Sequence, residues 1–302
     1  MKAAVLHRYG GPEELTYEDV PTPVPGPGDV LIKVAAAGIN PFDMREISGA
    51  IKDWHPLQFP AIIGRDVSGT VAQLGTGVSD LSVGDRVAGS AAHTFAEFVV
   101  AQADLFAKVP PQLDLIDAAA LPLVTLTGSE LISIASGIKP GDTVIVAGAA
   151  GGVGRSAVYM AKKLGGTVIA GVQRHQLDEA KSIAANQTVA LDDPAAFAAL
   201  PQVDIVANCI RGATASALMG KVKAGGTFAS VTGPPDNAKE YKAVKVVSFA
   251  SKPNKAQLQM LLEAVAAGQL TIPIDRRIPL REAAAGEAAA AKGGIGKVLL
   301  IP

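Results

Sequence analysis

The chain is poor in the residues that build disulfides and metal centres. Its 302 residues include a single cysteine, Cys209, and only four histidines. One cysteine cannot form an internal disulfide, and a structural zinc of the four-cysteine kind is excluded. The four histidines are scattered without the spacing of metal ligands, so we expect no metal site.

An excess of charge of either sign is also missing. The formal net charge is −1, and no basic residues cluster. Nucleic acids and anionic membranes are therefore not expected partners. No apolar run approaches the 18 residues of a membrane-spanning helix, and the run Ala3–Leu6 is too short for a signal peptide. We expect a cytoplasmic protein, and its length and 49% hydrophobic content indicate a globular chain of two domains.

The most informative stretch is TVIVAGAAGGVG, which covers residues 143–154. It reads as a short buried strand, a glycine-rich turn and the first turn of a helix, and a second strand follows over 167–172. The free N–H groups and the positive dipole of such a helix N-terminus suit a pyrophosphate. Because Ala149 replaces the first glycine of the usual six-residue pattern, an ordinary turn without a ligand stays open as an alternative.

The residues after the second strand indicate which dinucleotide binds. NAD-binding units place an acidic residue there for the ribose 2′-hydroxyl. No acidic residue lies between Gly154 and Asp178, and the strand ends in Gln173, Arg174 and His175. The arginine fork can hold a 2′-phosphate, which favours NADP(H) over NAD(H). Two observations leave an alternative open. Asp192 and Asp193 end the predicted third strand, close to where the adenosine end of the cofactor would lie. Arg174 can also be a solvated loop charge without a ligand.

The chain divides into a β part and a part in which strands and helices alternate. Residues 1–120 look all-β, which suggests a small barrel or sandwich. Residues 121–265 show six strands with helices between them, typical of a doubly wound sheet. The tail, 266–302, ends in a strand over 297–301 that needs a partner sheet, so we expect it to pair with the N-terminal domain. The predicted fold class is α/β.

Several diagnostic stretches occur in order along the chain, namely AAAGINPFDMREISG, PAIIGRDVSGTV, VGDRVAG, LPLVTLTG, AGAAGGVG, KAGGTF and GKVLL. Together they resemble the zinc-independent quinone oxidoreductases, the zeta-crystallin-like branch of the medium-chain dehydrogenase/reductase superfamily. The resemblance implies a GroES-like β-barrel catalytic domain, formed by 1–120 and 266–302, and a Rossmann NADP-binding domain. It also implies a homodimer.

The resemblance assigns cofactor roles to particular positions. Thr125 and Thr127 would lie near the nicotinamide, and Phe249 and Lys297 would close that side. Gln173, Arg174 and His175 would face the 2′-phosphate. Core packing for Phe249 and a surface position for Lys297 are the alternatives. The remaining roles are backbone contacts. Ala150, Gly151, Gly152 and Val153 would contact the pyrophosphate. Asn208, Cys209 and Ile210 would contact the ribose, and Val231, Thr232 and Gly233 the carboxamide.

The catalytic candidates lie in the segment 40–45. Asn40 could hydrogen-bond the nicotinamide ribose or the substrate oxygen, and Arg45 could steady negative charge on that oxygen. Asp43 and Arg45 could equally pair with each other as structural residues. Zinc-dependent relatives have cysteine in place of Asn40 and histidine in place of Arg65, so zinc chemistry is not expected.

The function predicted from the sequence is NADPH-dependent hydride transfer, without zinc, to a quinone or an α,β-unsaturated carbonyl. Such acceptors need little acid assistance because the resulting anion is delocalised, and the nicotinamide carries the hydride. An enoyl or alkenal reductase of the same superfamily is the alternative enzyme. A low-turnover NADPH-binding redox sensor or structural protein is the alternative outside catalysis. A methyltransferase-like nucleotide fold fits the glycine turn but not the N-terminal β domain.

Overall fold

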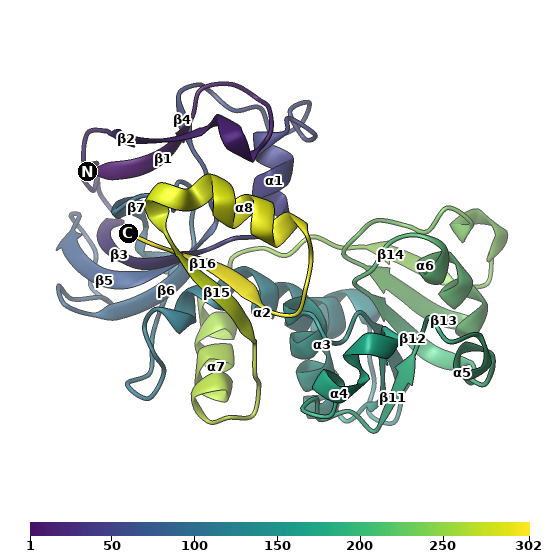
Figure 1. Cartoon of the computed structure of the whole chain (residues 1–302). Helices are drawn as coiled ribbons and strands as arrows, with labels where there is room; N and C mark the ends of the chain where they lie inside the picture. Colours follow the sequence, from purple (N-terminus) through teal and green to yellow (C-terminus); the bar gives the residue numbers. More distant parts are fainter. The chain divides into compact units, whose positions relative to one another are not determined.

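A computed structural model describes all 302 residues, which form two compact units. The first unit contains Met1–Leu123 and Pro253–Pro302, and the second contains Val124–Lys252. Figure 1 shows the purple N-terminal strands and the yellow C-terminal strands within the first unit. Helix α7 (Lys255–Ala266) belongs to this unit, where it contacts strand β8 (Phe106–Lys108). The sequence analysis had instead placed this helix at the end of the nucleotide-binding domain.

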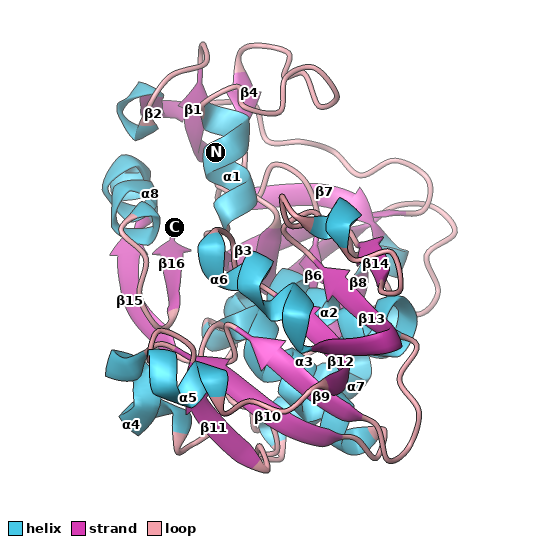
Figure 2. Cartoon of the chain, turned by 90° about the vertical axis from the view of Figure 1, so that its right-hand side faces the viewer, coloured by secondary structure: helices cyan, strands magenta, loops and turns pink.

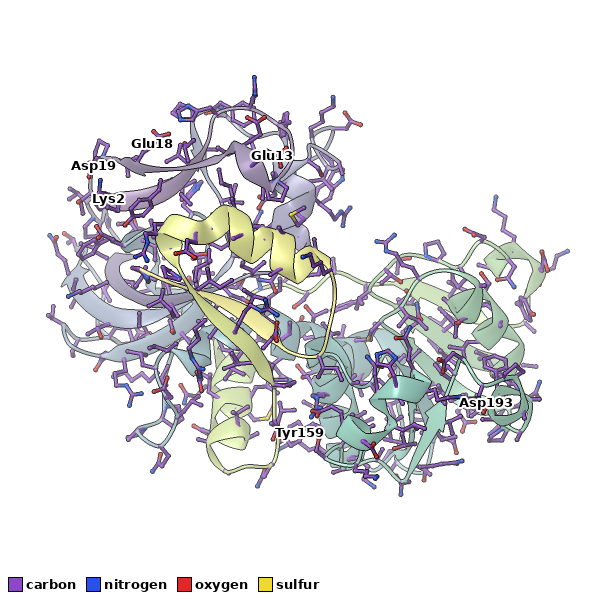
Figure 3. All side chains as sticks on the ribbon, viewed as in Figure 1. Lys2, Glu13, Glu18, Asp19, Tyr159 and Asp193 are labelled. Atoms are coloured by element: carbon purple, nitrogen blue, oxygen red, sulfur yellow. The ribbon has the colours of Figure 1, made fainter.

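The first unit contains two sheets. The larger has seven strands, of which β16 (Lys297–Ile301), β3 (Asp29–Gly38) and β5 (Asp66–Leu74) are central. Outside them lie β15 (Ile274–Pro279) on one side and β6 (Arg86–Ser90) and β8 on the other, while β7 (Phe98–Gln102) pairs with β3. The smaller sheet has the order β2 (Leu15–Asp19), β1 (Lys2–Leu6) and β4 (Ala61–Ile62). Figure 3 labels Lys2 and Asp19, the ion pair across β1 and β2.

Alternating apolar residues place one face of the larger sheet in a core. Val30, Ile32 and Val34 of β3 are buried with Val67 and Val71 of β5. Residues two apart on a strand point to the same face, so this spacing gives each strand one apolar face. Each such side chain contributes about 1.5–3 kcal/mol when it leaves water.

The closing strand pairs as expected from the sequence. β16 runs antiparallel to β3, with Leu299 opposite Gly38 and Leu300 opposite Ala37. Leu299 and Leu300 are fully buried. Pairing supplies the backbone partners that a buried strand requires, and it ties residues 297–301 to the N-terminal sheet.

The expectation that residues 1–120 are all-β is wrong at one place, because helix α1 (Pro41–Ile47) lies among the strands. Asn40 precedes the helix, and its backbone N–H donates to Asp43 Oδ2 at 2.7 Å. Pro41 occupies the first helical position, where its missing N–H costs nothing. Helix α8 (Ala283–Ala291) contacts α1, so this pair of short helices joins segments far apart in sequence.

The second unit is built on six parallel strands. Their order is β11 (Gln187–Ala190), β10 (Thr167–Val172), β9 (Thr143–Ala147), β12 (Val203–Asn208), β13 (Val222–Ser230) and β14 (Lys245–Ser248). The two halves of the sheet therefore diverge between β9 and β12, the doubly wound order of dinucleotide-binding folds. The six strands predicted from the sequence are all confirmed in position (Figure 2).

Helices connect these strands. α3 (Gly152–Lys163) joins β9 to β10, and the shorter α4 (Leu177–Ala180), α5 (Pro194–Ala198) and α6 (Ala213–Leu218) follow in order. Helix α2 (Pro122–Glu130) begins at a proline, and a π-helical turn continues it over Leu131–Ser136. Proline is tolerated in the first turn because no intrahelical bond is lost there. None of the helices has the length and apolarity to cross a bilayer.

The glycine turn after β9 packs too closely for side chains. A Cβ on Gly154 would lie 2.2 Å from the carbonyl oxygen of Gly148, and Gly148 itself has φ +81°. By contrast, a Cβ on Gly151 would meet nothing closer than 3.6 Å. The first turn of α3 thus sits directly on the turn that precedes it.

This packing predicts that Gly154→Ala destabilises the second unit. The clash forces the helix away from the turn, at a cost of about 1–3 kcal/mol or more. Thermal unfolding should show a lowered transition for Gly154→Ala and a near-native one for the control Gly151→Ala. Equal transitions for the two variants would contradict the packing described.

Candidate functional site

The cofactor candidates of the second unit gather at one edge of its sheet. In a parallel sheet the carboxyl ends of all strands meet at the same edge. The turn Gly148–Gly151 follows β9, residues 173–175 follow β10, residues 209–210 follow β12 and residues 231–233 follow β13. The turn after β9 meets the end of β12, where Cys209 N–H donates to the carbonyl of Ala147 at 3.0 Å. The sequence analysis had singled out all four segments.

The glycine turn has the features that a pyrophosphate site requires. The first N–H groups of a helix have no partner within it, and at α3 they belong to Gly152, Val153 and Gly154. Hydrogen bonding within α3 begins only at Arg155, whose N–H donates to Gly151 at 2.9 Å. A Cβ on Gly151 would meet nothing closer than 3.6 Å, so the helix end is open on that side, whereas Gly152 packs against Val124. The residues present therefore fit a dinucleotide phosphate.

Arg174 lies at the end of β10 but already has a partner. Its guanidinium donates to Asp193 Oδ2 at 2.6 Å, and its backbone N–H donates to Asp192 Oδ1 at 2.7 Å. The other carboxylate oxygen of Asp193, labelled in Figure 3, accepts the N–H groups of Ala195 and Ala196 at the start of α5. The Arg174 side chain is 65% exposed, so its ion pair contributes little, about 0–1 kcal/mol.

The ends of β12 and β13 are joined by a buried amide. Asn208 Nδ2 donates to Ile210 O at 2.8 Å, Ser230 Oγ at 3.0 Å and Thr232 Oγ1 at 3.2 Å. This network fixes the loops that carry the predicted ribose and carboxamide contacts. Burial raises the pKa of the Cys209 thiol to about 12, so Cys209 is a neutral thiol at physiological pH.

The remaining predicted residues of the second unit are buried or half-buried, unlike the exposed Arg174. Thr125 is fully buried on α2, and its carbonyl accepts Ser156 Oγ at 2.6 Å. Thr127 on the same helix, Val231 and Phe249 are half-buried. Phe249 N–H donates to the carbonyl of Ser230 at 2.8 Å, which extends the pairing just beyond β14. Core packing of Val231 and Phe249 is therefore only partial.

In the first unit, a buried lysine organises the catalytic candidates. Lys297 Nζ donates to the carbonyl of Ile39 and to Asn40 Oδ1, each at 2.6 Å, and lies 3.5 Å from Asp66 Oδ2. Lys297 is therefore not a surface charge. Burial lowers the pKa of Lys297 and raises that of Asp66. The two opposite charges compensate one another, which a buried charge requires.

Asn40 is the centre of this network. Its Nδ2 donates to Gly38 O and to Asp66 Oδ2, each at 3.1 Å, and the residue is only 1% exposed. Both N–H donors are thus used inside the protein. The structure gives Asn40 a clear structural role, and a direct hydrogen bond from its amide to substrate would require these bonds to break.

Asp43 belongs to a cluster of buried carboxyl groups that the sequence analysis did not find. Asp43 Oδ1, Glu46 Oε2 and both carboxyl oxygens of Glu287 are buried without a hydrogen-bond partner. Burial, together with the neighbouring carboxyl groups, raises the pKa of Asp43 to about 8 and that of Glu287 to about 9. Both carboxyl groups therefore keep their protons at neutral pH. Asp43 makes no ion pair with Arg45.

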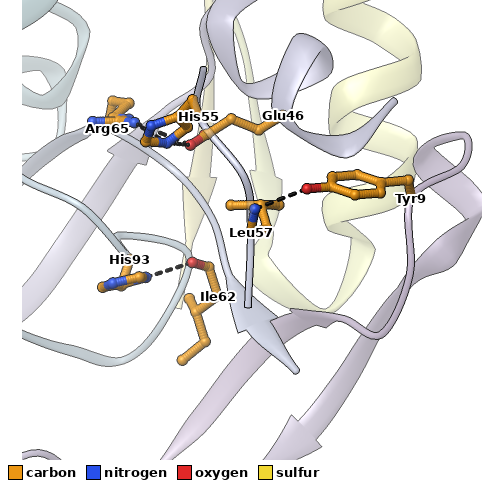
Figure 4. A network of polar contacts seen from close by, with 7 residues as sticks. All are labelled: Tyr9, Glu46, His55, Leu57, Ile62, Arg65 and His93. Carbon is orange, nitrogen blue, oxygen red and sulfur yellow. Dashed lines mark hydrogen bonds and ion pairs between the residues drawn. The ribbon is translucent and has the colours of Figure 1, made fainter. Parts of the chain in front are cut away.

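Arg45 and Arg65 occupy different surroundings. Arg45 is exposed on α1 and lies over the ring of Trp54, with its Cζ 5.9 Å from the ring centre. Arg65 lies over the ring of Phe42 at 4.5 Å and donates to Glu46 Oε1 at 3.0 Å. His55 shares that carboxylate oxygen, as Figure 4 shows. No local pattern along the chain indicates this network, because its members are separated by up to 19 residues.

No group of three or more histidine, cysteine, aspartate or glutamate side chains in the chain is arranged to hold a metal ion. Asn40 and Arg65, which stand where zinc-dependent relatives have ligands, are bound to Asp66 and to Glu46 respectively. An asparagine amide used in this way and a guanidinium are not zinc ligands.

Two family models match parts of the chain. A family model described as the alcohol dehydrogenase GroES-like domain matches residues 26–111, and one described as zinc-binding dehydrogenase matches residues 183–300. The chloroplast envelope quinone oxidoreductase homolog of Arabidopsis thaliana is 30% identical over 325 residues, which span 100% of this chain and 98% of the relative.

Solved structures are similar along the whole chain. A mycobacterial protein complexed with NADPH is 30% identical, with a TM-score of 0.85 and full coverage of both chains. A structure described as an NAD-dependent alcohol dehydrogenase is 28% identical, with a TM-score of 0.90 and full coverage of both chains.

The chain therefore belongs to the medium-chain dehydrogenase/reductase superfamily of oxidoreductases, with a GroES-like domain and a parallel six-stranded Rossmann-type sheet. Within that superfamily it falls in the quinone oxidoreductase-like branch.

The carboxyl cluster predicts an unusual dependence of stability on pH. Glu287 keeps its proton in the folded state up to about pH 9, whereas its ordinary pKa is 4.5. Between these values the folded state binds more protons than the unfolded state, so stability falls as the pH rises. Asp43 adds to this fall up to about pH 8.

Glu287→Gln removes the titrating group and should flatten the fall in melting temperature between about pH 6 and about pH 9. The control Glu282→Gln changes an exposed carboxylate, 51% exposed, just before the same helix. It should leave the slope unchanged. An unchanged slope in Glu287→Gln would show that this carboxyl group is ionised at neutral pH.

Proposed function

We propose that the chain is an NADPH-dependent, zinc-free oxidoreductase that passes hydride to a quinone or to an α,β-unsaturated carbonyl. The observation that carries the proposal is the set of N–H groups without an intrahelical partner at the start of α3, directly after the glycine turn, in a chain similar throughout to quinone oxidoreductases. The bound nicotinamide would supply the hydride. The protein would hold the cofactor and the acceptor and complete the reaction with a proton.

Each segment at the edge of the second sheet has a task in this proposal. The N–H groups of Gly152 and Val153 bind the pyrophosphate, because they are free and lie at the positive end of the α3 dipole. The loops fixed by Asn208 bind the ribose and the carboxamide through their backbone groups. Gln173, Arg174 and His175, all exposed, receive the 2′-phosphate.

The preference for NADPH depends on Arg174. The named cofactors of the two solved relatives differ, since one is complexed with NADPH and the other is called NAD-dependent. In this chain no carboxylate lies directly after β10 to accept the ribose hydroxyl groups of NADH, whereas Arg174 is 65% exposed and can turn from Asp193 to a phosphate.

The proposed contact between Arg174 and the 2′-phosphate predicts opposite changes in NADPH affinity for two variants. Arg174→Ala removes a charge-assisted contact worth about 1.5–3 kcal/mol, so the Kd for NADPH should rise by roughly 10–100-fold while that for NADH stays near its original value. Asp193→Asn keeps a capping side chain for α5 but removes the competing charge, and should tighten NADPH binding. Fluorescence titration with both cofactors measures this.

Lys181→Ala provides the control, since Lys181 is an exposed charge paired with Asp178 on α4. It should alter neither affinity. Equal losses for NADPH and NADH in Arg174→Ala would argue against the 2′-phosphate assignment.

The zinc-free part of the proposal rests on the donor set at Asn40 and Arg65. Dialysis against a chelator should leave activity and melting temperature unchanged, and metal analysis should find no stoichiometric zinc. Activity that falls on chelation and returns with added zinc would overturn it.

A panel of quinones and enones separates the enzyme from a low-turnover NADPH-binding protein and indicates the acceptor class. We also propose that the protein is cytoplasmic and, on the family resemblance alone, that it is a homodimer. Size-exclusion chromatography with light scattering tests the assembly.

A further inference from the structure

We propose that Arg65, His55 and Glu46 bind the oxygen of the acceptor and deliver its proton, and that Phe42 and Trp54 provide the surface on which a planar acceptor stacks. This inference rests on the proposed function, since it identifies the acceptor as a flat, oxygen-bearing ring such as a quinone. All five residues belong to the first unit.

The three polar side chains meet at a single carboxylate oxygen. Glu46 Oε1 lies 2.8 Å from His55 Nε2 and 3.0 Å from the Arg65 guanidinium, and His55 Nε2 is itself 2.8 Å from that guanidinium. Figure 4 shows the three side chains converging. The Glu46 side chain is 5% exposed, whereas those of Arg65 and His55 are 26% and 36% exposed. A buried carboxylate therefore holds two basic groups that reach solvent.

This geometry fixes one nitrogen of His55 and leaves the other free. When the ring is neutral, Nε2 can accept from Arg65, and the proton is then on Nδ1. When the ring is charged, both nitrogens carry protons and Nε2 donates to Glu46. No side chain or backbone group in the protein bonds Nδ1. Loss of the Nδ1 proton leaves a neutral ring only when the ring starts charged, so the charged form, with Nε2–H donating to Glu46, is the proton donor.

Among the catalytic candidates of the first unit and their partners, no other side chain combines a transferable proton with access to solvent. Asp43 and Asp66 are fully buried, and Lys297 is held by the carbonyl of Ile39 and by Asn40. The guanidinium of Arg45 does not lose its proton in proteins. His55 is thus the titratable group that is both attached to the site and partly exposed.

The aromatic rings beside this network suit a planar ligand. The ring centres of Phe42 and Trp54 are 6.2 Å apart, and that of His55 lies 5.6 Å from Phe42 and 5.9 Å from Trp54. The Trp54 residue is 62% exposed, which is unusual for so large an apolar group. The guanidinium group of Arg65 lies over Phe42, and that of Arg45 lies over Trp54. Positive charge therefore flanks these aromatic rings. An electron-poor ring with carbonyl oxygens complements both features.

The proton balance of quinone reduction fits these roles. The acceptor gains a hydride, supplied by the nicotinamide, and becomes a hydroquinone monoanion. Arg65 stabilises the negative oxygen, and His55 Nδ1–H breaks as the new O–H bond forms, which gives the hydroquinone. The lone pair left on Nδ1 takes a proton from water. One NADPH, one quinone and one proton thus give NADP⁺ and one hydroquinone.

Several charged groups face His55. Glu46 and Arg45 belong to α1, and Arg65 lies just before β5. Lys52 and Asp53 lie on its own loop. Histidine side chains change charge between about pH 5 and pH 8. If His55 is the donor, turnover should fall as the pH rises through this range.

The first experiment measures acceptor binding without cofactor, so that no turnover occurs. Trp54 is the only tryptophan, and its fluorescence reports on the cluster directly. Titration with 9,10-phenanthrenequinone should quench it saturably. Arg65→Met should weaken that binding by roughly tenfold, as expected for the loss of a charged hydrogen bond. The control Arg8→Met changes an exposed arginine paired with Glu14 and should bind as the native protein does.

Quenching that stays linear with quinone concentration, or an equal affinity in Arg65→Met, would overturn the binding site. NADPH titration and thermal unfolding of each variant show whether it is folded.

The second experiment tests proton delivery. His55→Gln keeps a side chain that can bond Glu46 but cannot transfer a proton. Its kcat with the quinone should fall by roughly tenfold or more, its KM should change little, and its profile should lose the fall between about pH 5 and pH 8. The control His7→Gln removes an exposed histidine that also pairs with a glutamate, Glu18.

A native kcat and pH profile in His55→Gln would reject His55 as the donor while leaving the proposed function intact. The failure of the native protein to reduce any quinone or enone would instead reject the proposed function itself. Saturable quenching of Trp54 would still test the binding site in that case.

Discussion

The first unit depends on the polar interactions of one buried group, the ammonium group of Lys297. It reaches from the last strand to the carbonyl of Ile39, the amide of Asn40 and the carboxylate of Asp66. Asp66 in turn accepts the N–H of Leu123, where the chain leaves the unit, at 2.8 Å. One charge thus ties together β16, the start of α1 and β5. Removing one partner would leave a buried charge uncompensated, which costs about 3–5 kcal/mol.

This arrangement explains why the C-terminal segment returns to the N-terminal sheet. The pairing of β16 with β3 satisfies the backbone hydrogen-bonding groups of β16. Lys297 lies at the start of β16, and only this register allows its side chain to make the polar contacts described above. The result is a rigid support for the N-terminus of α1. Phe42 and Glu46 project from that helix into the proposed acceptor site, so a residue that touches no substrate determines where the site lies.

In the proposed function, the two units would contribute in different ways. In the second, the site consists mainly of backbone N–H groups at strand ends, so that small residues such as Gly151 and Gly152 matter more than reactive ones. In the first, the site consists of side chains whose charges balance. Lys297 faces Asp66, and Arg65 faces Glu46. Neither set brings together three or more histidine, cysteine, aspartate or glutamate side chains that could hold a metal ion.

The parts of this description that could be predicted from the sequence are local. β9, the glycine turn, α3 and β10 follow one another within 30 residues, and their periodicity and glycines specify them without reference to the rest of the chain. The strand ends that carry residues 173–175 and 231–233 follow from the same reasoning. The resemblance to relatives added the family and the closing strand's Lys297.

Other features could not be predicted because they depend on contacts between distant segments. Helix α1 is only seven residues long and is rich in polar residues, so its periodicity is weak. The network of Glu46, His55 and Arg65 forms only when the loop after α1 folds back onto the start of β5. The sequence analysis therefore chose Arg45 as the cation near the acceptor, whereas the structure draws attention to Arg65. Glu287 was missed because an alanine-rich helix gives no sign that it packs against α1.

The measurement that tests the account most directly is the consumption of reduced nicotinamide by purified, metal-depleted protein with a series of quinones. The account predicts saturable, quinone-dependent oxidation of NADPH, with a higher kcat/KM than for NADH, and one hydroquinone formed for each NADPH consumed. If the protein binds NADPH but oxidises it with none of the quinones or enones, hydride transfer to such acceptors is not its function. The nucleotide site would then serve binding alone.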